Sequence, residues 1–387
     1  MAVENWVSRQ LDELTEFRRD LHRNPELLYD VERTASKVAD ALRAAGVDEV
    51  VTGMGRTGVV GVIRGNTDTR GRMIGLRADM DALPITEQTG APWTSTKPGV
   101  MHACGHDGHT TMLLGAARQL AESRAFDGTV IVIFQPAEEG GAGAKAMIDD
   151  GLFERFPVQE IYGLHNLPNL PLGQFAITPG ATMASVDEIR ISVEGIGGHA
   201  AFPHQTVDPI TVTAALIQAV QTIVSRNVDP LKSAVVSITT INGGDAFNVI
   251  PPVITLTGTV RTLDEGIRDL VEKRLRKAVA GIADAFDAKA ELKYVRSYPV
   301  TVNNAAKLEN AVRAAAEVVG AANVKTDLPP TMGGEDFAFM LEAVPGAFIF
   351  AGNGPSANLH HPQYDFNDEL IPFGCSYWTT LVRQLLG

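Results

Sequence analysis

The chain has 387 residues, of which 45% are apolar and 20% charged, and this is the composition of a globular protein too long for a single core. A formal net charge of -13 argues against nucleic acid or an anionic membrane as a partner, because both would repel the chain, and favours a small-molecule substrate. Two cysteines do not form a disulfide framework, and no segment resembles a signal peptide or a membrane span. These features predict a soluble cytoplasmic protein.

Secondary structure in the first half of the chain is predicted from apolar periodicity and from the turn residues that bound each apolar run. The predicted elements are helices at residues 6–24, 32–45, 110–121 and 143–151, and strands at residues 58–64, 73–77, 128–134 and 161–165. Alternating helices and continuous apolar strands predict a mixed, mostly parallel α/β sheet. Such sheets bind ligands beyond the carboxyl ends of their strands, and Asp79 and Asp81 follow one strand there. Turn-forming aspartates are the alternative.

The pattern changes near Thr182, where polar and apolar residues begin to alternate. The elements predicted next are a strand at residues 186–194, a helix at 208–226, strands at 234–241 and 253–261, a helix at 264–286 and a strand at 290–296. This β-α-β-β-α-β order predicts a ferredoxin-like sandwich of one antiparallel sheet and two helices. The sheet leaves free edges, which favour pairing with another subunit.

Helix and strand patterns alternate again at residues 307–320 and 347–351, so the chain returns to the first sheet. We therefore predict a discontinuous metal-binding catalytic domain over residues 1–182 and 297–387, with helices sandwiching an α/β sheet. The inserted α+β domain at residues 183–296 is predicted to serve as a dimerisation and lid domain.

The segment from Met101 to His109 gathers three imidazoles, one thiol and one carboxylate. Zinc and similar divalent ions favour these groups as ligands. Cys104 and His106 are two residues apart, which directs both side chains to one point in an extended or irregular backbone but not in a helix. We therefore predict a metal-binding loop. The alternative is a polar turn with a buried free cysteine.

Further candidate ligands lie at the ends of other predicted strands or in loops beyond them. They are Glu138 or Glu139, His165, and His360 or His361. Together with Cys104 and His106 they offer more ligands than a mononuclear catalytic zinc site uses. The set therefore predicts two metal ions that share a bridging ligand, for which the Cys104 thiolate is suited, and a water.

The adjacent residues Glu138 and Glu139 predict a division of roles. In an extended segment neighbouring side chains point in opposite directions, so one carboxylate can bind metal while the other faces the activated water. A glutamate beside such a water acts as a general base and then passes the proton to the leaving nitrogen. A solvated surface pair is the alternative.

Eight stretches, in chain order, carry a resemblance to a known family. They are Leu21–Leu27, Leu76–Pro84, Met101–His109, Gln135–Gly140, Gly163–His165, Gly197–Ala200, Gly333–Phe337 and Leu359–Pro362. With these motifs the chain resembles the dinuclear zinc aminoacylase and carboxypeptidase family. It is most similar to the amidohydrolase branch, which includes hippurate hydrolases, auxin-conjugate hydrolases and N-acetyldiaminopimelate deacetylases.

The resemblance implies a set of metal ligands, namely Cys104, His106, Glu139, His165 and His360. His361 remains the alternative to His360. The resemblance also implies that Glu138 is the general base and that Asp79 orients a ligand. Relatives outside the branch carry a histidine ligand at the position of Arg77, and His106 would replace that imidazole here.

The resemblance extends to the inserted domain. His199, in a glycine-rich loop, resembles a histidine that enters the partner subunit's active site and stabilises the tetrahedral oxyanion. Asn248 and Arg261 resemble residues that hold the free carboxylate of the substrate, which an arginine fork can bind with two contacts. The alternatives are a locally hydrogen-bonded loop histidine and a solvated strand arginine.

Together these features predict a metal-dependent amidohydrolase that cleaves N-acetyl, N-benzoyl or N-arylacetyl amino acids to a carboxylic acid and a free amino acid. The cofactors would be two divalent ions per subunit, zinc or else manganese, cobalt or nickel, in a homodimer or tetramer. The alternatives are a metallo-carboxypeptidase or dipeptidase of the same family, a hydrolase with Cys104 as nucleophile beside His106 or His109, and a catalytically silent metal-binding protein. Chelation separates the metal-dependent mechanism from the cysteine mechanism.

Overall fold

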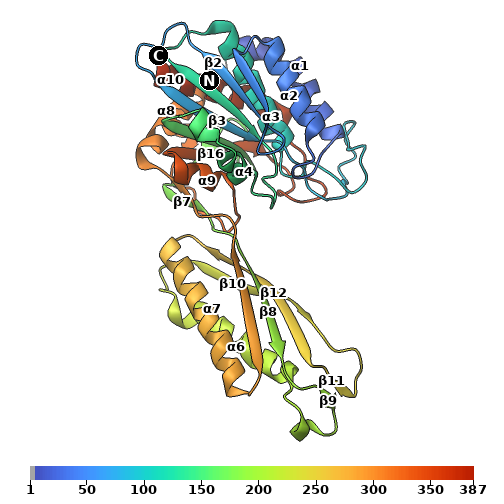
Figure 1. Cartoon of the computed structure of the whole chain (residues 1–387). Coiled ribbons are helices and arrows are strands. Elements are labelled where there is room, and N and C mark those ends of the chain that lie inside the picture. The colour runs from blue at the N-terminus through green and yellow to red at the C-terminus, as the bar shows by residue number, and fades with distance from the viewer. Residues whose placement is uncertain (1–4) are drawn as a thin grey trace. The chain divides into compact units, whose positions relative to one another are not determined.

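The computed structural model of the protein describes residues 5–387, which form two compact units (Figure 1). The first unit runs to Gly180 and continues over Val302–Pro329 and Asp336–Gly387, and the second comprises Ala181–Thr301 and Pro330–Glu335. Residues 330–335, which the sequence pattern placed in the first domain, therefore group with the second unit. Within residues 5–387, no helix combines the length and apolarity needed to cross a membrane.

The first unit is built on an eight-stranded sheet with the order β1-β2-β4-β3-β5-β16-β6-β15. Its strands are β1 (Glu49–Met54), β2 (Gly58–Arg64), β3 (Met73–Asp79), β4 (Thr129–Gln135), β5 (Glu160–Pro168), β6 (Phe175–Ala176), β15 (Val324–Lys325) and β16 (Gly346–Gly354). The central strands pair in parallel, β3 with both β4 and β5, and β5 with β16. β1 and β2 are antiparallel at one edge. The sheet is thus mixed and mostly parallel, as predicted.

Helices cover both faces of this sheet. They are α1 (Asn5–Arg23), α2 (Glu32–Ala44), α3 (His106–Ser123), α4 (Gly143–Asp149), α5 (Leu152–Arg155), α8 (Ala305–Val319), α9 (Phe337–Ala343) and α10 (Ile371–Leu386), with short 3-10 turns η2 (Ala321–Asn323) and η3 (Asp368–Leu370). α3 contacts α1, α2 and α10, whereas α4 contacts α9. These contacts define two separate helical groups.

The side chains of β4 point alternately to the two faces of the sheet, which explains why both faces need a layer of helices. All seven residues of this β-branched strand are buried. Val130, Val132 and Phe134 belong to the core formed with α1, α2, α3, α8 and α10. Ile131 and Ile133 are equally buried but lie outside that core, on the opposite face, because successive strand residues point to opposite sides. A strand that is apolar on both faces stays in a central position in the sheet.

The second unit carries a four-stranded antiparallel sheet with the order β10-β12-β8-β13. Its elements are β8 (Asp187–Glu194), β9 (Gly198–His199), η1 (Pro203–Gln205), α6 (Pro209–Asn227), β10 (Ala234–Asn242), β11 (Val249–Ile250), β12 (Val253–Thr262), α7 (Glu265–Ala285) and β13 (Lys289–Arg296). Figure 1 shows α6 and α7 side by side against this sheet, and their apolar residues share one core with it. Two short strands, β7 (Gly180–Met183) and β14 (Thr301–Asn303), form a separate pair at the unit boundaries. This arrangement confirms the predicted fold class.

Candidate active site

Neighbouring parallel strands of the large sheet, β4, β3 and β5, bring their carboxyl ends to one edge. Asp79 is the last residue of β3, and the turn after β4 carries Glu138 and Glu139. The prediction that β5 ends at His165 is wrong, because the strand continues to Pro168. The added residues extend the parallel ladder between β5 and β16, which the sequence of β5 alone does not reveal.

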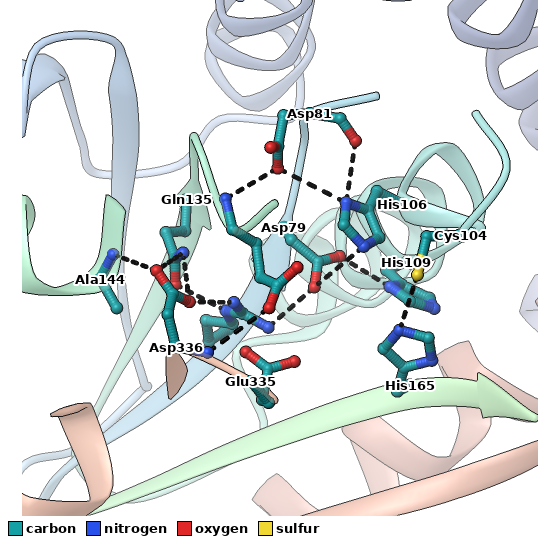
Figure 2. Close-up of polar contacts among 12 residues, drawn as sticks. Asp79, Asp81, Cys104, His106, His109, Gln135, Ala144, His165, Glu335 and Asp336 are labelled. Atoms are coloured by element: carbon teal, nitrogen blue, oxygen red, sulfur yellow. Dashed lines mark hydrogen bonds and ion pairs between the residues drawn. The ribbon is translucent and has the colours of Figure 1, made fainter. Parts of the chain in front are cut away.

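The segment before α3 corrects another expectation. We predicted a loop through His109, but α3 begins at His106, so His106 and His109 lie on the first helical turn. Gly105 caps this helix at φ 91°, and a Cβ there would come within 2.5 Å of the Tyr364 hydroxyl. The sharp turn at Gly105 therefore needs glycine for both its conformation and its space. Cys104, before the turn, and His106, after it, still point to one place (Figure 2).

The structure brings together all the side chains predicted to bind metal. We refer to them as the strand-end cluster: Cys104, His106, Glu139, His165 and His360. Their donor atoms fall into overlapping groups in which all atoms lie within 4.8 Å of one another, Cys104 with His106 and His165, and Cys104 with Glu139 and His360. Glu138 forms a further such group with His106 and Glu139. His361 belongs to no such group in residues 5–387, and its Nδ1 accepts the N–H of Gln363 at 3.1 Å.

Hydrogen bonds set the tautomers of two imidazoles in the strand-end cluster. The Nδ1–H of His106 donates to the Asp81 carbonyl at 2.8 Å, and the Nδ1–H of His165 donates to the Asn166 carbonyl at 2.7 Å. Because a carbonyl can only accept, the lone pair of each ring is on Nε2 when the ring is neutral, as a metal ligand must be. Nε2 of His165 lies 3.4 Å from Sγ of Cys104. Both rings therefore present a ligating nitrogen to the cluster.

The residues present fit divalent metal ions. Nε2 of His106 is buried and has no hydrogen-bond partner in residues 5–387, which is rare for a buried polar atom. Burial lowers the pKa of His106, but the charges of Asp79 and Asp81 overcome this effect and raise it to about 10. The site thus holds an excess of negative charge that favours a cation. A thiol, three imidazoles and a carboxylate form a donor set typical of zinc and related ions.

The same environment argues against Cys104 as a nucleophile. Burial, together with the charges of Glu139 and Glu138, raises the pKa of the Cys104 thiol well above its ordinary value. A catalytic cysteine needs the opposite, a lowered pKa supplied by a nearby positive group. Burial lowers the pKa of His165 well below the ordinary value and also lowers that of His109, so neither imidazole supplies that charge. The pKa of the Cys104 thiol stays raised even though the pKa of the nearby His106 is about 10.

Asp79 contacts the cluster indirectly. It accepts hydrogen bonds from Nδ1 of His109 at 2.7 Å and from the Arg77 guanidinium at 2.8 Å, while Nε2 of His106 lies 3.8 Å away. Nε2 of His109 in turn accepts the backbone N–H of Asn166 at 2.9 Å, next to His165. From the sequence we considered His109 only as a possible partner of a Cys104 nucleophile. Had we predicted that the helix begins at His106, the spacing of three residues would have placed His106 and His109 on one face of that helix. That spacing is the signal that would have identified His109.

Glu138 is buried and is held by residues from distant parts of the chain. The backbone N–H of Asp336 donates to Oε1 of Glu138 at 3.4 Å. The Asp336 carboxylate accepts a hydrogen bond from Arg77 at 3.0 Å. It also accepts one from the Gln135 side chain at 2.8 Å, and Figure 2 shows Gln135 beside Asp336. Sequence analysis noted Asp336 only as part of a motif, because nothing in its neighbours indicates a partner 198 residues away.

The predicted substrate-binding residues of the second unit are not all together. His199 lies on β9 and is exposed, and its neighbour Ala200 donates its N–H to the carbonyl of Asn248 at 3.0 Å. Arg261 is the penultimate residue of β12, whose first residue, Val253, lies nearest the β9–β11 pair. Arg261 lies eight positions after Val253 along the strand, a distance of about 26 Å. Within one chain, His199 and Asn248 are neighbours, and Arg261 is remote from them.

Comparison with known proteins identifies the family. The model of "Peptidase family M20/M25/M40" matches residues 75–384. The chain belongs to this peptidase family. A hippurate hydrolase of Campylobacter jejuni is 46% identical over 97% of both chains, and an N-acetylcysteine deacetylase of Bacillus subtilis is 40% identical over 96% of this chain and 97% of its own. The crystal structure of the Bacillus subtilis YxeP protein, described as a dinuclear metal binding peptidase of the M20 family, is 36% identical with a TM-score of 0.86 over 98% and 99% of the two chains.

Membership of the M20 family agrees with the resemblance found in the sequence and with the two-unit architecture. The protein is therefore a hydrolase of amide bonds, as predicted. The catalytically silent alternative has no support among these relatives.

Proposed function

We propose that the protein hydrolyses the amide bond of N-acyl amino acids that carry an acetyl, benzoyl or arylacetyl group, releasing a carboxylic acid and a free amino acid. The observation that carries this proposal is the strand-end cluster beside the buried carboxylate of Glu138. Relatives that act on hippurate, which is N-benzoylglycine, and on N-acetylcysteine support this substrate class.

In the proposed site, the side chains of Cys104, His106, Glu139, His165 and His360 would hold two divalent ions, because their donor atoms lie close together. Zinc is the first candidate, and manganese, cobalt and nickel are alternatives, because the donor set combines soft and hard ligands. Bound there, the ions would supply Lewis-acid activation of the acyl carbonyl and of a water molecule. Burial raises the pKa of the Cys104 thiol, so this residue would act as a ligand only where a bound cation favours the thiolate.

Glu138 is the proposed general base. It takes a proton from the attacking water and delivers it to the nitrogen of the leaving amino acid. The N–H of Asp336 contacts Oε1 of Glu138, and this contact limits the rotation of the carboxylate. Asp79, which the Arg77 guanidinium and His109 hold in place, would keep a negative charge near Nε2 of His106 and so favour a cation at that nitrogen.

Residues of the second unit are proposed to bind the remaining parts of the substrate. His199 would stabilise the oxyanion, and Asn248 and Arg261 would hold the free carboxylate. Because Arg261 lies about 26 Å along the strand from the β9–β11 end, one chain cannot bring it and His199 to the same small substrate. We therefore propose that one of these contacts comes from a second copy, in a homodimer or tetramer.

A substrate panel tests the proposed function. The metal-free protein, prepared with a chelator, is loaded in turn with zinc, manganese, cobalt and nickel. Each form is assayed with N-acetyl, N-benzoyl and indoleacetyl amino acids, and with unblocked dipeptides. We expect no turnover without metal and hydrolysis of at least one N-acyl amino acid with metal. Cleavage of dipeptides alone would favour a peptidase, and no cleavage with any metal would refute the proposal.

A further inference from the structure

Asp81 lies two residues beyond the end of β3 and is buried, with 1% of its surface exposed. It is not part of the strand-end cluster, yet its side chain contacts the turn that carries both glutamates. Oδ1 of Asp81 accepts the backbone N–H of Glu138 at 3.0 Å, and Oδ2 accepts the backbone N–H of Glu139 at 3.1 Å. Two successive N–H groups directed at one carboxylate form an anion-binding concavity in the main chain.

The main chain of Asp81 makes an equally specific contact. Its carbonyl accepts the Nδ1–H of His106 at 2.8 Å, and this bond leaves Nε2 of His106 as the ligating atom (Figure 2). Ala82, the next residue, donates its N–H to the carbonyl of Glu26 at 2.7 Å, so the backbone around Asp81 is itself fixed. One residue therefore contacts a proposed base and two proposed ligands.

The turn that carries Glu138 and Glu139 needs such an anchor. Ala137 precedes them with φ 54°, in the left-handed region that residues other than glycine rarely adopt. Glu138 and Glu139 then point to different partners, Glu138 toward Asp336 and Glu139 toward His360. A small rotation of this turn would move both carboxylates together.

We propose that Asp81 is a positioning residue that fixes Glu138 and Glu139 through its carboxylate and the tautomer of His106 through its carbonyl. The part of this inference that concerns Glu138 rests on the proposed function. The part that concerns Glu139 and His106 depends only on metal binding. A neighbour of metal ligands that orients them in this way usually changes metal affinity or activity by about 10- to 100-fold when it is replaced.

The test is the Asp81→Asn variant of the full chain, which keeps the size of the side chain but replaces one acceptor with an amide NH2 group. That group faces a backbone N–H and cannot bond to it. We expect cobalt affinity, measured by chelator competition, to fall about 10- to 100-fold. The visible absorption of the cobalt-loaded protein should change, because the ligand field reports the position of Glu139. At saturating metal, kcat should fall about 10- to 100-fold while KM changes less than about 3-fold.

Asp127→Asn is the matched control, because it makes the same change from carboxylate to amide. Asp127 lies just before β4, at the opposite end of that strand from Glu138 and Glu139. Its Oδ1 accepts the backbone N–H of Thr69 at 2.7 Å, and its Oδ2 accepts the Thr69 hydroxyl at 2.6 Å. We expect its cobalt spectrum, cobalt affinity and kcat to match those of the unaltered protein, although its thermal stability falls.

The results distinguish this inference from the proposed function. If Asp81→Asn keeps its cobalt affinity, spectrum and kcat within about 3-fold of the unaltered protein, Asp81 is only structural and the inference is refuted. If the unaltered protein cleaves no N-acyl amino acid, the proposed function fails, but the cobalt measurements still decide the role of Asp81 at Glu139 and His106. Should Asp81→Asn not fold, Asp81→Ser, which retains one acceptor, is measured against the same criteria.

Discussion

In the first unit, the side chains around the strand-end cluster are buried and hydrogen-bonded to one another, so that Asp79, Asp81 and Asp336 each hold a functional neighbour. In the second unit, His199 and Asn248 are exposed on or beside two-residue strands. The difference fits our proposal that the first region is organised to bind metal before the substrate arrives and that a second copy completes the substrate contacts. Mutations in the first region should alter metal binding or the chemical step, and those in the second should alter turnover or substrate binding with the metal intact.

The largest effect is expected at the glutamate pair. Glu138→Gln should lower kcat by about 100- to 10,000-fold with an unchanged metal content, because it removes the base and keeps the shape. Glu139→Gln should lower metal affinity instead, since it replaces an anionic ligand with a neutral one. Kinetics and elemental analysis of both variants check this division. Loss of metal from Glu138→Gln, with Glu139→Gln unaffected, would reverse the two assignments.

His199 gives the sharpest test of the second region. His199→Ala should lower kcat by about 100- to 1,000-fold and leave the metal content intact, as removal of an oxyanion donor does. Co-expression of His199→Ala with Glu138→Gln, with a different tag on each chain, should recover about a quarter of the activity per site. This fraction follows because half of randomly formed dimers are mixed and one of their two sites then has both residues. No recovery in purified mixed dimers would mean that His199 acts within its own chain.

Arg261 should affect substrate binding rather than the chemical step. Arg261→Lys loses the planar two-point contact with a carboxylate and should raise KM about 10-fold, with kcat changed less than about 3-fold. The matched control is Arg190→Lys on the neighbouring strand β8, where the side chain is exposed. With substrates whose carboxylate is converted to an amide, Arg261→Lys and the unaltered protein should have the same KM. A persistent difference would assign Arg261 to another part of the substrate.

The last effect is expected on stability rather than on turnover and involves His22 in the first unit. Its Nδ1 lies 2.8 Å from Asp107 and its Nε2 lies 3.2 Å from Glu87, so both ring nitrogens face carboxylates. Burial and the nearby Arg18 lower the pKa of His22, but the two carboxylates overcome them and raise it to about 9. The folded protein thus binds the proton more tightly than the unfolded chain, whose histidine has a pKa near 6.5.

The stabilisation by protonated His22 should therefore be complete below about pH 6.5 and disappear as the pH rises through about 9. The free energy of unfolding of the unaltered protein, minus that of His22→Gln, should decrease by about 3 kcal/mol between pH 6 and pH 10. Denaturant titrations at several pH values check this, with the exposed His204→Gln as control. A difference that stays constant with pH would show that the ion pair is not formed.

Much of the secondary structure could be predicted, because it depends on the local pattern of apolar and polar residues. The continuous apolar run of β4 and the alternation of β8 each report the burial of their own residues. The candidate ligands Cys104 and His165 were recognisable because thiols and imidazoles seldom gather at strand ends without a metal. The preference for His360 over His361 came from a motif, and the positions of their donor atoms agree with it.

The sequence by itself determined the central strands of the large sheet, the element order of the second unit, and which chemical groups the strand ends carry. The tertiary structure alone decided that α3 begins at His106, that Asp81 holds both glutamates, and that Arg261 lies far from His199. Periodicity reports whether a side chain is buried, but not which distant group shares that buried space. Hydrogen bonds such as that between Asp336 and Glu138, 198 residues apart, exist only once packing has brought the strand ends together.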